Sequence, residues 1–171
     1  FLLPAIFERG LIQTKYLIVG YFNFRAHFVA VRQFFSLFWG YGSSLWGPND
    51  GLSFQIGLVN VVVLAIAAFF GVLHRKDKKF LMLLGVLGIS FFVSIFLQHN
   101  KSAFVWEALP LMAFIQFPWR FLGITVFIVS LTGAVITSYL NNKFLPLYVI
   151  LLIAAILSTV MYFRPKEYVD D

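Results

Sequence analysis

The chain has 171 residues, of which 61% are hydrophobic and only 12% are charged, and its mean hydropathy is +0.89. A soluble domain has about 45–50% apolar and about 25% charged residues, so this composition excludes an ordinary water-soluble globule and indicates lipid as the solvent. The net charge of +6 comes from scattered basic residues and does not indicate a nucleic-acid interface, and the absence of cysteine excludes disulfides and Cys-ligated metals.

The first 51 residues are expected to form a region at one membrane face. The chain opens on an apolar run without a Met, which indicates a fragment of a larger protein. Over 21–38, apolar residues recur at helical spacing while Arg25 and Arg32, seven positions apart, share a face. This pattern predicts an amphipathic helix in the membrane interface, with its arginines at the lipid head groups.

A glycine-punctuated loop follows over 40–51, and two interpretations of it stay open. Asn49 or Asp50 caps the helix that comes next, or the loop as a whole faces a ligand, because glycine lets a backbone approach closely. Asp50 and His27 are the candidate ligand-facing residues of this region. His27 and His99 are not spaced as metal ligands, so we expect hydrated loop positions for both and predict no metal site.

Four uncharged apolar stretches are each close to the roughly 20 residues that a helix needs to cross a bilayer core of about 30 Å. None contains Asp, Glu, Lys, Arg or His, so a helix satisfies every backbone polar group without burying a charge. The expected fold is therefore an all-α, polytopic transmembrane bundle, and residues 52–171 form its membrane region. The predicted spans are 52–73, 80–97, 121–140 and 144–163.

The connections between these stretches predict their orientation. The 74–79 link carries four Lys or Arg in six positions, and the 141–143 link is short with one Lys, so both are expected in the cytoplasm. Segments 1–51, 98–120 and 164–171 then lie outside. This places the protein in the cytoplasmic (plasma) membrane, with the lipid bilayer and the remaining transmembrane helices of a full-length protein as its partners.

The outer loop 98–120 ends in Gln-Phe-Pro-Trp-Arg-Phe, where Pro118 favours a helix start near Trp119. Arg120 then emerges at the membrane surface, either as an interfacial anchor for any head group or as a specific ligand for a lipid phosphate. Glu107 is a lone carboxylate in an apolar setting. It is an acid–base candidate or the partner of Lys101.

Several of these motifs together resemble one family. The Tyr21-Phe22-Asn23-Phe24-Arg25-x-His27-Phe28 run, the 39–43 and 47–57 segments, and the 116–122 run look like the bacterial and archaeal membrane proteins that carry the 6-pyruvoyl-tetrahydropterin synthase-related membrane domain. Such proteins resemble membrane glycosyltransferases of the GT-C class, which take sugars from polyprenyl-phosphate carriers at the outer face. Nothing in the chain suggests pterin chemistry.

The resemblance implies a polyprenyl-linked sugar donor, a divalent metal in some members, and a catalytic carboxylate in an outer loop before Phe1. It carries a phosphate-contacting role onto Arg120, and onto Arg25 and Arg32. The leading hypothesis is therefore part of a membrane glycosyltransferase-like protein, active or inactive. The alternative is a non-catalytic transport or assembly subunit, which a continuous polar path through the bundle would favour.

Overall fold

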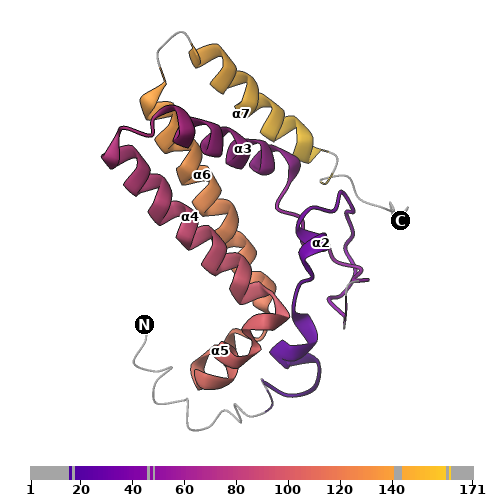
Figure 1. Ribbon diagram of the computed structural model, residues 1–171. Helices are drawn as coiled ribbons and strands as arrows, with labels where there is room; N and C mark the ends of the chain where they lie inside the picture. The colour runs from indigo at the N-terminus through magenta and orange to yellow at the C-terminus, as the bar shows by residue number, and fades with distance from the viewer. Residues whose placement is uncertain are drawn as a thin grey trace, which may run out of the picture.

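The computed structural model describes residues 16, 18–45, 47, 49–140, 144–160 and 162. Within them the fold is helical, and its frame is the antiparallel pair α4 (Lys78–Gln98) and α6 (Phe121–Tyr139), which lie side by side in Figure 1. Contacts at both ends fix the antiparallel arrangement. They are a hydrogen bond between Ser94 and Thr125 at one end, and the packing of Phe80 on Tyr139 at the other.

Both helices of the pair are long and apolar enough to cross a membrane. Asp77 starts α4 cleanly, because its carboxylate accepts the Phe80 N–H at 3.0 Å as an N-cap. Little of either helix is buried inside the chain. The buried share of the most apolar 18 residues is 11% in Lys78–Gln98 and 28% in Pro118–Tyr139, whereas a core helix of a soluble protein is mostly buried. The helices expected over 80–97 and 121–140 are thus confirmed.

The first and last predicted spans are shorter as helices. α3 (Leu58–Leu73) and α7 (Leu145–Val160) have 16 residues each, which gives a length of about 24 Å. Residues 52–57 form no helix, and α3 begins only after Gly57, whose φ is 94°. Residues 161 and 163 of the fourth expected span lie outside the described residues, as does the 141–143 link.

α3 packs against the part of α6 that ends at Tyr139, and α7 packs on α3. The chain leaves the buried core at Ile56, and α3 then runs to its C-cap His74, next to the start of α4. Beyond the end of α7, the ring of Tyr162 stacks on Trp39 with 4.1 Å between centroids. In Figure 1, α7 lies along α3, and α3 crosses α6 obliquely.

The expected amphipathic helix over 21–38 is wrong. The segment forms three short pieces instead, η2 (Gly20–Phe22), η3 (Phe24–His27) and α2 (Val31–Phe34). Between η3 and α2 the backbone is extended, and the Val29 N–H donates to the Gln98 carbonyl oxygen at 2.8 Å. This tertiary hydrogen bond takes a donor that a continuous helix would use, so helical spacing of the Phe residues did not give a helix.

The buried core lies where α4 ends and α6 begins. Val29, Phe34, Phe54 and Ile56 form it, and Phe91, Ile95, Trp119 and Leu122 of the helix pair and its approach pack against it. The segment 52–57 contributes the alternate residues Phe54 and Ile56. The Ile56 N–H also donates to the Phe34 carbonyl at 2.9 Å, which joins this segment to α2.

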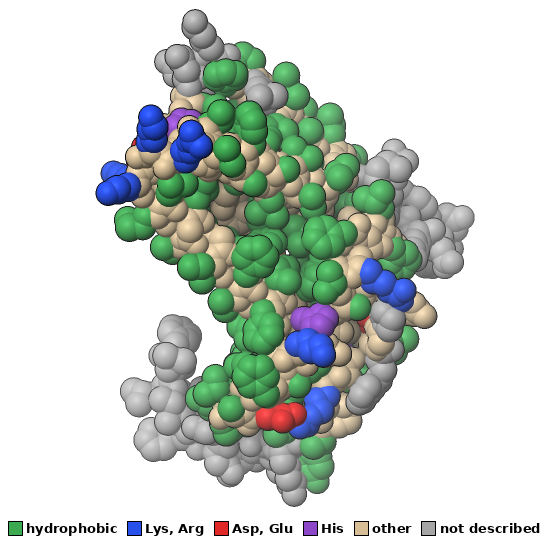
Figure 2. Space-filling view, in the orientation of Figure 1, with side chains coloured by type: hydrophobic (Ala, Val, Ile, Leu, Met, Phe, Trp, Pro, Cys, Tyr) green, Lys and Arg blue, Asp and Glu red, His purple; other side chains and the backbone are tan. Residues whose placement is uncertain are grey.

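Charged side chains gather at the two ends of the helix pair. Arg75, Lys76, Lys78 and Lys79 are exposed around the turn between α3 and α4. Figure 2 shows these basic side chains at one end, both basic and acidic side chains toward the other, and a mainly hydrophobic surface between. We call the turn the basic end. We call residues 20–56 and 99–120, with the adjoining ends of α4 and α6, the aromatic end.

A candidate binding site at the aromatic end

His27 joins three segments at the aromatic end. Its Nε2 bonds the Tyr21 carbonyl oxygen, and its Nδ1 lies 2.9 Å from the Ser44 hydroxyl. A carbonyl only accepts, so Nε2 donates to it, and in the neutral ring Nδ1 then accepts from Ser44. The ring also packs edge-on against Phe117, with 4.7 Å between centroids. The expected hydrated position of His27 is wrong, because the side chain is buried and fully bonded.

A cleft of about 540 Å³ also opens at the aromatic end. Its volume falls in the range of about 300–1,000 Å³ that is usual for small-molecule sites. It lies between α2 and the 49–54 segment, and its polar lining is one guanidinium, one carboxylate, two side-chain amides and two hydroxyls. The lining residues are Arg32, Gln33, Ser36, Phe38, Asn49, Asp50, Leu52, Ser53 and Phe54.

Two side-chain bonds hold the cleft in shape. An Arg32 guanidinium nitrogen donates to Asn49 Oδ1 at 2.9 Å, and Gln33 Nε2 donates to Asp50 Oδ2 at 2.7 Å. Gln33 is itself oriented, because its Oε1 accepts the Ala30 N–H at 2.7 Å. The loop is thereby fastened to α2 at two successive residues.

Asp50 does not cap the first long helix. That helix begins at Leu58 with Gly57 at its N-cap, whereas the buried Asp50 carboxylate accepts from Gln33 and from the Leu45 N–H at 2.5 Å. The capping interpretation is therefore wrong for both Asn49 and Asp50. Both residues instead line the cleft, and a ligand-facing role for the loop stays a prediction.

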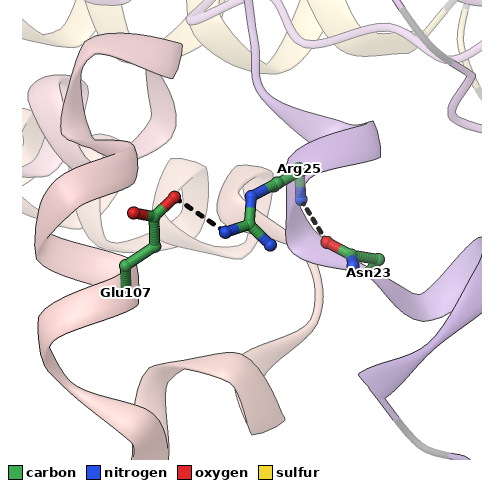
Figure 3. Close-up of polar contacts among 3 residues, drawn as sticks. All are labelled: Asn23, Arg25 and Glu107. Carbon is green, nitrogen blue, oxygen red and sulfur yellow. Dashed lines mark hydrogen bonds and ion pairs between the residues drawn. The ribbon is translucent and has the colours of Figure 1, made fainter.

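Arg25 is paired with Glu107 across 82 positions of sequence. One guanidinium nitrogen lies 2.8 Å from Glu107 Oε1, and the Arg25 N–H donates to the Asn23 side chain (Figure 3). The two charged side chains are 52% and 50% exposed. The expected pairing of Glu107 with Lys101 is wrong, because the fold brings η3 to the α5 helix (Ala103–Ala108) instead.

Arg120 lies at the start of α6, as expected, but outside the lining of the cleft. It donates to the Ile115 carbonyl at 2.9 Å, and its guanidinium carbon lies 5.0 Å from the centre of the Phe117 ring. Of the three candidate arginines, Arg32 alone lines the cleft. Within the described part of the chain, no three His, Asp or Glu side chains come together as a metal site.

The sequence motifs did not single out Gln33, Ser36, Ser44 or Ser53. One signal for this arrangement was present, since Leu52-Ser53-Phe54-Gln55-Ile56-Gly57 alternates strictly between apolar and small or polar residues. That period of two indicates an extended segment with one buried face and one open face. The expected span 52–73 absorbed it into a helix.

Comparison with protein-family models, with curated proteins and with solved structures gives no match to this chain. The resemblance to the 6-pyruvoyl-tetrahydropterin synthase-related membrane domain therefore stays an expectation that the quoted motifs carry.

Proposed function

We propose that the chain is part of a glycosyltransferase-like protein of the cytoplasmic membrane, and that the Arg32 cleft receives the phosphate of a polyprenyl-phosphate-linked sugar at the outer face. The observation that carries this proposal is the placement of the Arg32 guanidinium in a cleft of ligand size, beside amides and hydroxyls. A planar guanidinium binds two phosphate oxygens at once, and the amides and hydroxyls suit a sugar.

In this proposal all four helices cross the bilayer, and the basic end faces the cytoplasm. Two features support it. The exposed Lys and Arg of the 74–79 link gather at one end of the α4–α6 pair, and α4 and α6 have spanning length. The positive-inside rule then places the aromatic end outside. The shorter α3 and α7 would span by local thinning or with flanking residues at head-group depth.

The depth of the cleft fits a lipid-linked ligand. Phe38 lines the cleft, and Phe38, Trp39 and Tyr41 next to it are exposed. Trp and Tyr concentrate at the membrane–water interface because their rings are amphipathic. A carrier phosphate lies at this same depth. Its sugar would extend into water while its prenyl chain stays among the acyl chains.

The residues of this chain would bind and stabilise charge. A leaving carrier phosphate gains negative charge, which a cation already in place stabilises without reorganising. The Asp50 carboxylate accepts two hydrogen bonds inside the fold, and the Glu107 carboxylate is paired with Arg25. Each of these carboxylates therefore has a structural partner. The reacting carboxylate is assigned to another part of a longer protein, as the resemblance implies.

The alternative transport function would need a polar route between the helices. The polar side chains that bond between α4 and α6 lie near the aromatic end, at Ser94, Gln98 and Thr125. Further along, α6 buries Val129, Thr132 and Ile136, and the Thr132 hydroxyl is bonded within its own helix, to the Ile128 carbonyl. This distribution supports a site at one end over a path through the pair.

The test compares Arg32→Ala with Arg75→Ala in the intact protein reconstituted in nanodiscs, with polyprenyl phosphate as the titrated ligand. Both variants lose one positive charge, but Arg75 lies at the basic end. A lost charged hydrogen bond of about 1.5–3 kcal/mol raises the Kd of Arg32→Ala roughly 10- to 150-fold. Arg75→Ala should bind like the wild type.

An equal loss of affinity in the two variants would show that the overall positive charge, and not the Arg32 cleft, attracts the ligand. An unchanged Kd for a folded Arg32→Ala would show that the phosphate does not bind in this cleft, and the alternative of a non-catalytic subunit would then be favoured.

A further inference from the structure

Two short helices at the aromatic end expose a group of large apolar side chains. They belong to α5, to η5 (Pro110–Ile115) and to Leu109, the one residue between the two helices. Phe104 is 64% exposed, Leu109 53%, Leu111 76% and Phe114 43%. We call these four side chains the α5–η5 face.

Buried contacts hold α5 against the end of α4. Trp106 of α5 is buried, its Nε1 donates to the Leu97 carbonyl at 3.0 Å, and its ring stacks on Phe24 at 5.3 Å between centroids. The Ser102 hydroxyl bonds the carbonyls of Leu97 and His99. These contacts clamp α5 to the last turn of α4. Its apolar residues are therefore exposed although α5 itself is firmly packed.

The α5–η5 face continues an apolar stripe of α4. Positions 82, 86, 89, 93 and 96 follow the spacing of one helix side, and all five side chains are large, apolar and exposed. At the end of the stripe, the Phe96 ring meets the Phe104 ring of α5 with 6.2 Å between centroids. Figure 2 shows the surface hollowed between α4 and α5.

Charged groups lie at the border of the face. Glu107 lies on α5 itself, and its half-exposed ion pair with Arg25 connects α5 to η3. The exposed Lys101 lies just before α5. A short helix that carries large apolar side chains with charges at its edge has the composition of an element in the membrane interface, where the charges reach the head groups.

We propose that the α5–η5 face is embedded in the outer leaflet of the membrane, with lipid acyl chains as its partner and the Arg25–Glu107 pair at the head groups. The face would anchor the aromatic end, and with it the Arg32 cleft, at a fixed depth. The inference rests on the proposed insertion of α4. It is independent of what the cleft binds.

The test places one nitroxide spin label at a time in the intact protein in nanodiscs of phosphatidylethanolamine and phosphatidylglycerol. The 171 residues contain no cysteine, so Leu111→Cys introduces a unique site within them. Power saturation compares the accessibility of the label to oxygen, which concentrates in lipid, with its accessibility to a water-soluble nickel chelate. Ile89→Cys in the middle of the α4 stripe is the lipid control, and Lys76→Cys at the basic end is the water control.

The inference predicts that the Leu111 label favours oxygen, with a depth between those of the two controls. Access to nickel equal to that of Lys76, while Ile89 remains in lipid, would overturn the inference and leave the insertion of α4 intact. Protection from both reagents would also overturn it, because a protein surface would then cover the face. A water-exposed Ile89 label would refute the insertion itself, and the proposed function with it.

Discussion

The side-chain nitrogen of Gln98 lies 3.0 Å from the hydroxyl oxygen of Thr125, inside the contact between α4 and α6. Both side chains are buried, and the Thr125 hydroxyl also lies 2.8 Å from that of Ser94. The backbone carbonyl oxygen of Gln98 accepts a hydrogen bond from the Val29 N–H. We call Ser94, Gln98 and Thr125 the polar clamp, because they fix the helix register where the aromatic end is attached.

The coupling between Gln98 and Thr125 should be modest. Hydrogen bonds between membrane helices average about 0.6 kcal/mol and reach about 1.7 kcal/mol. A double-mutant cycle of Gln98→Leu and Thr125→Val, measured by reversible unfolding in bicelles, should therefore give a favourable coupling free energy in this range. A coupling of zero would show that the two side chains do not bond in the membrane.

Adjacent serines provide a matched pair at the His27 junction. Ser44→Ala leaves His27 Nδ1 buried without its donor, which should lower the free energy of unfolding by about 1–3 kcal/mol. Ser43 is exposed, so Ser43→Ala should change the stability by less than about 0.5 kcal/mol. Denaturant unfolding of both variants measures the difference. Equal stabilities would contradict the buried hydrogen bond.

Gly42 and Gly85 form a second matched pair. A Cβ at Gly42 would come 2.7 Å from Gly51 Cα, so Gly42→Ala must push apart the antiparallel bridge between Tyr41 and Leu52, at a cost of about 1–3 kcal/mol. A Cβ at Gly85 meets nothing within 4 Å, and Ala is favoured over Gly in a helix by about 0.5–1 kcal/mol. Thermal unfolding should therefore rank Gly85→Ala above the wild type and Gly42→Ala below it. The reverse order would contradict the loop geometry.

The Arg25–Glu107 ion pair should contribute little to stability. Both side chains are about half exposed, and pairs of this kind are worth about 0.2–1 kcal/mol. A cycle of Arg25→Ala and Glu107→Ala should give a coupling below about 1 kcal/mol that decreases further in 1 M salt, where the Debye length is about 3 Å. A large coupling that salt does not change would indicate a pair buried by lipid or protein.

The sequence predicted the central helix pair closely. The helices expected over 80–97 and 121–140 are observed at Lys78–Gln98 and Phe121–Tyr139. In a long uncharged run, a helix is the structure that satisfies every backbone polar group within the segment. The approach to α6 was also predicted, since Pro118 opens a short turn that ends at Arg120. Local composition determines these features, so they can be predicted from a single sequence.

The aromatic end was predicted less well because contacts between distant segments decide it. Val29 bonds Gln98 and Arg25 meets Glu107, and neither pairing leaves a local pattern in the sequence. The helical spacing over 21–38 was real, but the hydrogen bond from Val29 competes with a continuous helix there. His27 was placed in water because its neighbours in sequence do not reveal that Ser44 and Phe117 enclose it.

The central claim is that α4 carries the chain across a membrane, from the basic end inside to the aromatic end outside. The most direct test labels single cysteines at Lys76 and Lys101, two exposed residues at opposite ends of α4, with a membrane-impermeant maleimide in intact cells. Lys101→Cys should react from outside, whereas Lys76→Cys should react only after the membrane is permeabilised. Equal reactivity of both positions before permeabilisation would contradict the account.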